Sequence, residues 1–415
     1  MPSSATSDSP PRVLGVLIAR NEWPLLGISI THALVNHVDE LIVVDHSSTD
    51  ETQAGLAALK QRWGNRIQIL HLCEGTFHHE ETNLMLKTMY EDRDFDWVYP
   101  IDADEFLITP NNVPLKQLLA KVPESNKVVR HELHNFLAPS DFVENDFQRY
   151  SELNEKAVVN PEFQLTHETI FETVLSGDLD FFDVPFDSKV MFRLPQESWA
   201  IGGSHFMLGV ERESEFKFSA EETFVAHLPF LTRDRLMLRV AQGQDLEKSG
   251  YSRDHGWQSQ VVNQMAIEGR LDEYWQRNSL PVEPSKIQAP TPRTMTDNRL
   301  ASVLENAIAE LLPTLDTIDA TGLNSQPKCQ PEVTISQGIQ AIRGMALNKQ
   351  RGIDATFAHV ADLNQHITNL QSQLEAQAIQ YSLEREKILG SLSWRSTRGL
   401  RLIHQWVKAR TKKLV

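Results

Sequence analysis

Three carboxylates directly follow a short apolar run. Residues Trp97–Ile101 have the composition of a buried strand, and Asp102, Asp104 and Glu105 come next. Ligands of an open α/β sheet bind beyond the carboxyl ends of its strands, so these side chains should face a ligand. Paired hard oxygen ligands suit Mg²⁺ or Mn²⁺, which complete their shell with waters and substrate phosphates. The pattern predicts a Mg²⁺ or Mn²⁺ site for a nucleoside diphosphate, although a solvated acidic turn has the same short motif.

The elements that must position these carboxylates alternate in type. Apolar runs predict strands at Val13–Ile18, Leu41–Val44, Ile67–Leu72 and Trp97–Ile101, and helical spacing predicts helices at Leu25–Asn36, Thr52–Trp63 and Glu81–Tyr90. Strands separated by helices indicate right-handed crossovers. The sequence therefore predicts an α/β fold with a largely parallel, doubly wound sheet.

Two further polar clusters follow predicted strand ends. Arg20-Asn21-Glu22 comes after the first strand, and the stretch Asp45–Asp50 comes after the second. We expect both clusters to meet the carboxylates at one edge of the sheet. Ordinary explanations stay open: Ser48 with Glu51 fits a helix capping box, and Arg20 fits a simple ion pair with Glu22.

Composition narrows the class of protein. A formal charge of −16 over 415 residues argues against general nucleic-acid binding, because phosphate contacts need a basic face. Two cysteines, Cys73 and Cys329, imply no disulfide framework and fit reduced thiols. No signal-peptide pattern opens the chain, and no apolar run is long enough to span a bilayer. We expect a cytoplasmic protein, soluble or peripheral on the inner face of the plasma membrane.

The second half of the chain must supply the general base of any transfer reaction. Lys127–His131 is a predicted strand, and Lys189 begins another that leads to the glycine pair before His205. A later apolar strand ends at His227. Acidic candidates for the base are Asp141, Glu162, Glu168 and Glu172, and the residue types do not choose among them.

Taken in the order in which they occur along the chain, the motifs resemble those of family 2 glycosyltransferases. The segments that carry the resemblance are Ala19–Glu22 (A-R-N-E), Val43–Asp50 (V-V-D-H-S-S-T-D), Asn83, and Ile101–Leu107 (I-D-A-D-E-F-L). The resemblance is nearest to a bacterial branch with R-N-E, D-x-S-[ST]-D and D-A-D-E-F. It covers Val13–Leu107 well and continues weakly to about Val240.

The resemblance implies a glycosyltransferase A-type, Rossmann-like mixed and mainly parallel sheet, and a metal-dependent, usually inverting transfer from a nucleotide sugar. Carried over by position, the donor-binding residues are Arg20, Asn21, Glu22, Asp45, Asn83, Asp102 and Lys189. The implied metal ligands are Asp102, Asp104 and His205, with His227 as the second histidine candidate; His205 and Asp141 are the catalytic candidates. Two positions depart from the pattern: His46 replaces a common acidic residue, and Glu51 stands where glycine is usual.

Composition divides the chain further. We predict a disordered segment at 1–11, a catalytic domain at 12–278, a Pro-rich linker at 279–299, a helical region at 300–390 and a basic tail at 391–415. Within the helical region, Leu300–Leu312 is a predicted helix stopped by Pro313. A two-heptad apolar seam from Val360 to Leu374 fits either a short dimerising coiled coil or a helix packed on its own domain.

The tail predicts a peripheral membrane contact. From Lys387 to Val415 there is no Asp or Glu, and Trp394 and Trp406 lie among basic residues. Ser393–Thr397 also resembles a tail of bacterial surface-polysaccharide glycosyltransferases. A solubilising tail or a partner-binding helix would have the same composition.

These inferences predict a metal-dependent glycosyltransferase that moves a sugar from a nucleotide-sugar donor to a glycan or lipid-linked acceptor, in cell-surface polysaccharide synthesis. The alternatives are a nucleotidyltransferase, which also uses paired carboxylates and a metal, and an inactive glycosyltransferase-like adaptor.

Overall fold

The computed structural model describes residues 10–72, 90, 93–159, 167–194, 200–201, 205–207, 215–219, 221–248, 250, 253, 256–282 and 294–321. Met1–Ile342 forms one compact unit, and Arg343–Val415 forms a second that lies outside the described residues. The predicted N-terminal disorder, the apolar seam and the basic tail also lie outside them, as does the helix predicted at Glu81–Tyr90 except for Tyr90 itself.

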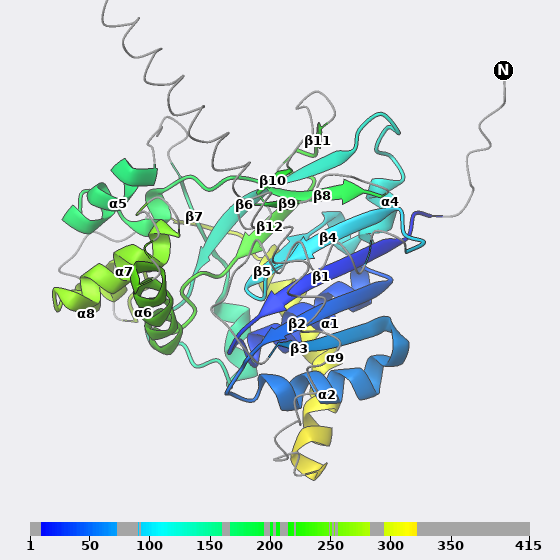
Figure 1. The fold of residues 1–415 in the computed structure, drawn as a ribbon, viewed down its shortest axis with the longest axis horizontal. Coiled ribbons are helices and arrows are strands. Elements are labelled where there is room, and N and C mark those ends of the chain that lie inside the picture. The colour runs from blue at the N-terminus through cyan, green and yellow to red at the C-terminus, as the bar shows by residue number, and fades with distance from the viewer. Residues whose placement is uncertain are drawn as a thin grey trace, which may run out of the picture. The chain divides into compact units, whose positions relative to one another are not determined.

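Four parallel strands form one half of the main sheet (Figure 1). They are β1 (Val13–Ala19), β2 (Glu40–His46), β3 (Ile67–Leu72) and β4 (Trp97–Ile101), in the order β4-β1-β2-β3. The apolar runs of β1, β2 and β4 are buried on both faces, as strands of a covered parallel sheet require, whereas only Ile67 is buried in the edge strand β3. The four strand predictions are confirmed, and all four carboxyl ends lie at one edge.

Helices α1 (Leu25–Asn36) and α2 (Thr52–Trp63) flank these strands, as predicted. The indole of Trp23 packs against a glycine of each helix, Gly27 of α1 and Gly55 of α2. A Cβ added at Gly27 would come within 2.8 Å of the indole, and one at Gly55 within 2.2 Å. The two glycines therefore make room for the residue that follows the R-N-E motif.

Helix α9 (Arg299–Thr321) packs against α1 and α2 and extends the first core. Its buried face consists of Leu300, Ala301, Val303, Leu304, Ala307, Ile308 and Leu311. The predicted stop at Pro313 is wrong, since the helix continues through it. Proline removes one backbone donor, but Thr314 beyond it is buried and Leu315 packs on the core, and this packing outweighs the lost bond.

The second half of the sheet is mixed. It comprises β5 (Glu105–Ile108), β6 (Val128–Leu137), β7 (Glu155–Ala157), β8 (Lys189–Arg193), β11 (Glu215–Lys217), β12 (Phe224–His227) and β13 (Thr294–Thr296). Strand β8 joins the halves, antiparallel to both β4 and β6. Strand β12 lies between β6, to which it is parallel, and β5, to which it is antiparallel. The predicted mixed α/β sheet is confirmed.

A helical layer and several short elements complete the unit. Helices α5 (His167–Ser176), α6 (Arg233–Lys248), α7 (Trp257–Ile267) and α8 (Leu271–Arg277) surround a second, aromatic core that includes Phe181, Phe230 and Trp257. The short elements are α4 (Leu115–Leu119), the 3₁₀ turns Gly64–Arg66, Pro110–Asn112, Phe147–Glu152 and Phe181–Asp183, and the hairpin β9 (Ala200–Ile201) with β10 (Phe206–Met207).

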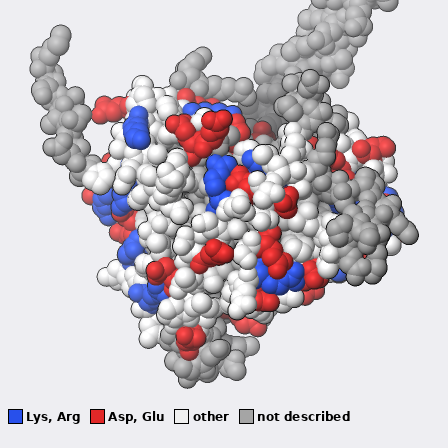
Figure 2. Space-filling model, turned by 180° about the vertical axis from the view of Figure 1, so that it is seen from behind, with Lys and Arg blue, Asp and Glu red and all other residues white. Residues whose placement is uncertain are grey.

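The surface carries charges of both signs. On the face shown in Figure 2, basic and acidic groups lie next to one another over a largely uncharged surface. The ion pairs of the protein include Lys116 with Asp39 at 2.7 Å and Arg253 with Glu172 at 2.6 Å. Among the described helices, none is both long and apolar enough to cross a bilayer.

Candidate functional site

The loops after β1 and β2 are tied to one another at the carboxyl edge of the sheet. Asn21 has a left-handed backbone, with φ of 58°, and its N–H donates to Ser48 Oγ at 2.9 Å. Its side-chain Oδ1 accepts from the Thr49 N–H at 2.7 Å. The capping-box alternative for Ser48 is wrong, because its hydroxyl serves this loop contact and α2 has Glu51 at its N-cap.

Asp45, at the end of β2, is fully buried and fully hydrogen-bonded. Its Oδ1 accepts from the Ser48 N–H at 3.1 Å, and its Oδ2 contacts His71 Nδ1 at 2.9 Å. Burial raises the pKa of this carboxyl, but the hydrogen bonds from His71 and Ser48 outweigh burial and lower it. The carboxylate is thus stabilised in its charged form beside the half-buried imidazole of His71, on β3.

Lys189 bridges two of the carboxylates that follow β4. Its Nζ lies 2.6 Å from Asp102 Oδ2 and 2.8 Å from Glu105 Oε1. The side chains of Lys189 and Glu105 are each 5% exposed, whereas that of Asp102 is 34% exposed. Burial, with the charges of Asp102 and Asp104, raises the pKa of Glu105 well above its ordinary value, and Lys189 opposes this rise.

Asp104 lies beside a histidine and an arginine. Its Oδ2 is 3.3 Å from His227 Nε2 and 3.4 Å from Arg239 Nη2. Burial works against ionisation here, but the charges of His227, Arg239 and Lys189 lower the pKa of Asp104 below its ordinary range. Single ligand atoms of Asp104, Glu105 and His227 all lie within 4.8 Å of one another. This cluster has the composition and the spacing of a metal site.

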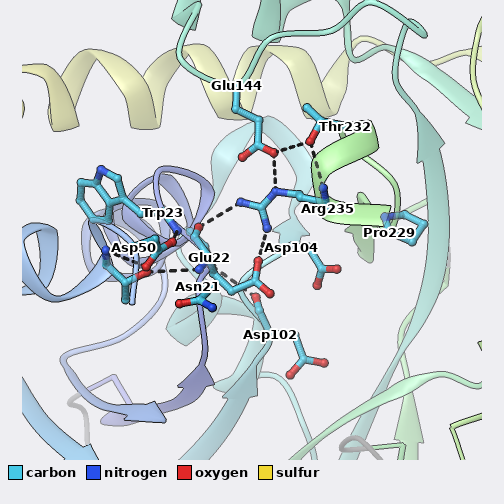
Figure 3. Close-up of polar contacts among 12 residues, drawn as sticks. Asn21, Glu22, Trp23, Asp50, Asp102, Asp104, Glu144, Pro229, Thr232 and Arg235 are labelled. Atoms are coloured by element: carbon cyan, nitrogen blue, oxygen red, sulfur yellow. Dashed lines mark hydrogen bonds and ion pairs between the residues drawn. The ribbon is translucent and has the colours of Figure 1, made fainter. Parts of the chain in front are cut away.

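Arg235 of α6 connects the R-N-E loop to the segment after β6 (Figure 3). Its Nε donates to Glu144 Oε1 at 2.6 Å, and its Nη1 pairs with Glu22 Oε2. Thr232 Oγ1 also donates to Glu144 Oε1, at 2.9 Å. Burial and the charge of Asp104 raise the pKa of Glu22 to about 7, although Arg235 and Arg239 oppose the rise. Arg235 with Glu22 and Glu144 is here called the clamp, and Glu22 in it lies within electrostatic reach of Asp104.

Among the described residues, the permanent charges of this region do not balance. Five carboxylates, those of Glu22, Asp102, Asp104, Glu105 and Glu144, share three permanent cations, Lys189, Arg235 and Arg239. Low-dielectric surroundings make an unmatched carboxylate costly, and the raised pKa values of Glu22 and Glu105 reflect that cost. A divalent cation between Asp104, Glu105 and His227 would supply the missing positive charge, so the residues fit such an ion.

The other predicted site residues lie in different surroundings. Arg20 is exposed at the end of β1 and forms no ion pair with any described residue. His205 Nδ1 donates to Asp187 O at 2.9 Å, and burial and the charge of Lys189 lower its pKa to about 3, while Asp102 opposes them. Asn83 lies outside the described residues. His205 is therefore neutral and within electrostatic reach of the Lys189–Asp102 pair.

The acidic base candidates do not contact the cluster in the described part of the chain. Asp141 pairs with Arg149 at 2.8 Å, and its side chain is 52% exposed. Glu172 pairs with Arg253 on the surface. Glu162 and the side chain of Glu168 lie outside the described residues. The assignment of the base, like that of the other site residues, stays a prediction.

Sequence reasoning missed His71, Asn135, Glu144, Arg235 and Arg239. Arg235 and Arg239 could have been predicted from the sequence. Residues four apart in a helix share a face, and this helix closely follows His227-Leu228-Pro229. No local pattern in the sequence points to His71 or Asn135. They reach the site through the register of neighbouring strands, in which His71 pairs with Asp45 and Asn135 pairs with His227.

Comparison with known proteins gives one family match. Residues 16–127 match the family profile described as Glycosyl transferase family 2. This range contains the R-N-E loop, the Asp45–Asp50 stretch and the carboxylates after β4. None of the curated proteins matches the chain.

Solved structures show weak likenesses. S. aureus TarS 1-349 is 12% identical, over 76% of this chain and 92% of that one, with a TM-score of 0.31. The mannosyltransferase PcManGT from Pyrobaculum calidifontis, in complex with GDP-Man and Mn²⁺, is 15% identical over 82% of this chain and 84% of that one, with a TM-score of 0.26. Glucosyl-3-phosphoglycerate synthase from Mycobacterium tuberculosis, in complex with Mn²⁺, UDP and phosphoglyceric acid, is 19% identical over 44% and 56%, with a TM-score of 0.24.

Proposed function

We propose, from the premise that residues 16–127 belong to glycosyl transferase family 2, that this protein is a metal-dependent glycosyltransferase. It moves a sugar from a nucleotide-sugar donor to a glycan or lipid-linked acceptor. The observation that carries the proposal is the cluster of Asp104, Glu105 and His227, whose ligand atoms lie within 4.8 Å of one another next to the family motifs.

The metal in this proposal is Mn²⁺ or Mg²⁺, held by Asp104, Glu105 and His227. When bound, such an ion acts as a Lewis acid that neutralises the negative charge of the leaving diphosphate. This ligand set shares Asp104 with the set predicted from the sequence. We assign Asp102 and His205 to the surroundings of Lys189 instead, where Asp102, 34% exposed, would meet a ribose hydroxyl.

The transfer breaks the bond between the anomeric carbon of the donor and its phosphate oxygen, and it forms one to an acceptor oxygen. The acceptor hydroxyl loses its proton to a base, for which His205 and Asp141 are the candidates. The cations Lys189 and Arg239 lie beside the carboxylates and would stabilise charge on the departing diphosphate. Asp45 and His71, at the ends of β2 and β3, would bind the nucleoside.

The test is thermal unfolding with a panel of nucleotide sugars in the presence of Mn²⁺. Binding stabilises the folded protein by mass action, by about 2.7 kcal/mol at a hundred times the dissociation constant, so the right donor should raise the Tm. The same panel is repeated on Asp104→Ala. We expect donor-dependent stabilisation to be lost in the variant. Donor-dependent stabilisation that survives unchanged in Asp104→Ala would contradict the metal role.

Product analysis separates this proposal from its alternatives. A glycosyltransferase releases a nucleoside diphosphate, whereas a nucleotidyltransferase releases pyrophosphate. An inactive adaptor would retain the nucleotide and yield neither product under any divalent metal. We further propose hexosyl transfer with inversion, and the anomeric configuration of the product, read by NMR, tests it: an unchanged configuration would contradict inversion.

The cellular setting is also proposed. We propose that residues 391–415 hold the enzyme on anionic membrane at the inner face of the plasma membrane, where it builds a cell-surface glycan. The basic composition of this tail and its two tryptophans support the proposal. Deletion of Ser391–Val415 should remove the protein from sedimenting anionic liposomes. Equal sedimentation of the full chain and the truncated chain would contradict it.

A further inference from the structure

Three strands place three polar side chains in one row at the candidate metal site. His227 is the last residue of β12, and strand register pairs it with Glu105 of β5 on one side and Asn135 of β6 on the other. All three residues are buried. The row therefore continues from two of the proposed metal ligands to an uncharged amide.

Asn135 contacts the imidazole of His227 on the nitrogen that does not face the carboxylates. Asn135 Oδ1 lies 2.8 Å from His227 Nδ1, and His227 Nε2 lies 3.3 Å from Asp104 Oδ2. An amide oxygen only accepts hydrogen bonds, so Nδ1 must carry the hydrogen of this contact. In the neutral ring the lone pair then lies on Nε2, on the side of Asp104 and Glu105, and a cation that binds there takes the place of any hydrogen that Nε2 shares with Asp104.

The opposite arrangement would close the site to a cation. If Nδ1 accepted a hydrogen bond, the ring hydrogen would sit on Nε2, and that nitrogen could only donate to Asp104. Histidine ligands of metals are ordinarily held in one tautomer by a hydrogen bond at the other ring nitrogen, and loss of that partner costs roughly 10–100-fold in metal affinity.

We infer that Asn135 is a positioning residue that fixes the tautomer and the ring orientation of His227, so that Nε2 is presented to a divalent cation. Asn135 does not touch the cation or the substrate itself. The inference rests on the metal site of the proposed function, and it adds a fourth residue on which the affinity for the cation depends.

The experiment measures Mn²⁺ affinity directly, from the EPR signal of free Mn²⁺, on the full chain without any sugar nucleotide. Asn135→Leu keeps a similar side-chain size and removes the acceptor, and it should weaken Mn²⁺ binding about 10–100-fold. Asn135→Asp keeps an acceptor oxygen at the same place and should bind Mn²⁺ at least as tightly as the wild type. Asn278→Leu is the matched control, because Asn278 is equally buried but contacts Phe181 and Tyr274, and its Mn²⁺ affinity should not change.

The outcomes separate this inference from the proposed function. If the wild type fails to bind Mn²⁺, or if Asp104→Asn binds it as the wild type does, the metal site is wrong and the inference falls with it. If the wild type binds and Asp104→Asn does not, but Asn135→Leu binds like the wild type, only the role of Asn135 is overturned.

A second measurement covers the case in which Asn135→Leu does not fold. In wild-type protein with ¹⁵N-labelled histidine and one equivalent of Zn²⁺, a diamagnetic ion that takes imidazole ligands, long-range ¹⁵N–¹H spectra show which ring nitrogen carries hydrogen. We expect hydrogen on Nδ1 of His227, with the resonance identified by its loss in His227→Gln. Hydrogen on Nε2 would overturn the inference.

Discussion

The single carboxylate Asp45, here called the first group, and the pair Asp104 and Glu105, called the second group, lie at the same edge of the sheet in different surroundings. Asp45, after β2, receives hydrogen bonds from Ser48 and His71, and its pKa is lowered. Asp104 and Glu105, after β4, pair with Arg239 and Lys189, and Lys189 also pairs with Asp102. The pKa of Asp104 is lowered, whereas that of Glu105 is raised. Among the described residues, the first group has its hydrogen-bond partners within the protein, and the second group, with Asp102, has more carboxylates than permanent cations.

The difference indicates what each group is prepared to bind. A buried, fully hydrogen-bonded carboxylate orients its partner, here the half-buried His71, which can hydrogen-bond to a neutral ligand such as a nucleoside. A cluster with unmatched negative charge is prepared for a cation. A nucleotide sugar with its divalent metal has both features, which is why the two groups belong to one proposed site.

The largest expected effect follows from removing one charge in the second group. Asp104→Asn keeps the size of the side chain, and it should lower the rate of nucleoside diphosphate release about a thousandfold, since Lewis-acid stabilisation is worth several kcal/mol and each 1.36 kcal/mol is tenfold. Asp245→Asn, on the exposed surface of α6, is the control and should leave the rate unchanged. Equal rates for the two variants would remove the contrast between the groups.

Arg235 is expected to have the next largest effect, on stability. Arg235→Leu leaves the partly buried Glu22 and Glu144 without their cation, and it should lower the free energy of unfolding in urea by about 3 kcal/mol. Arg253→Leu breaks an exposed pair with Glu172 and should cost about 1 kcal/mol or less. Similar losses in both variants would mean that the clamp contributes no more than a surface pair.

A smaller loss of stability is expected at Asn21, which donates to Ser48, the residue that in turn donates to Asp45. Asn21→Ala removes the acceptor of the Thr49 N–H and forces alanine into a left-handed backbone, so it should lower the free energy of unfolding by about 2 kcal/mol. Asn21→Gly tolerates that backbone and should lose only about 1 kcal/mol, the hydrogen bond. Equal values for both variants would rule out a contribution from the backbone conformation.

The last prediction is a pH dependence at Glu22. Its pKa is raised from 4.5 to about 7 in the folded protein, so between these values the folded state retains a proton that the unfolded state has lost. The resulting stability is fully present below pH 4.5 and is lost as the pH rises through about 7. Urea midpoints without metal should fall over this window, and less steeply in Glu22→Gln. Parallel pH profiles for wild type and variant would contradict the raised pKa.

The first half of the fold could be predicted because its signals are local. Each of β1–β4 is an apolar run bounded by polar residues, and Asp45 and Asp102 stand at strand ends that any parallel sheet brings together. The resemblance to family 2 glycosyltransferases came from the same stretch, and the match over residues 16–127 confirms it.

The rest of the site depends on contacts between distant segments. His227 was a candidate by its motif, but its neighbours Glu105 and Asn135 follow from register between β5, β12 and β6, which no local pattern encodes. Lys189 was predicted as a donor contact, and its bridge between Asp102 and Glu105 appears only when β8 lies beside β4. At Pro313 the local signal itself was misleading. Proline predicts the end of a helix, but the packing of α9 on the first core outweighs that propensity.

The most direct test of the central claim is anomalous diffraction at the manganese edge from crystals of the full chain soaked with Mn²⁺ and a nucleoside diphosphate. The account predicts one anomalous peak within coordination distance of Asp104, Glu105 and His227, with the diphosphate beside it. A peak at another site, or a diphosphate bound with no metal at these three residues, would contradict the account.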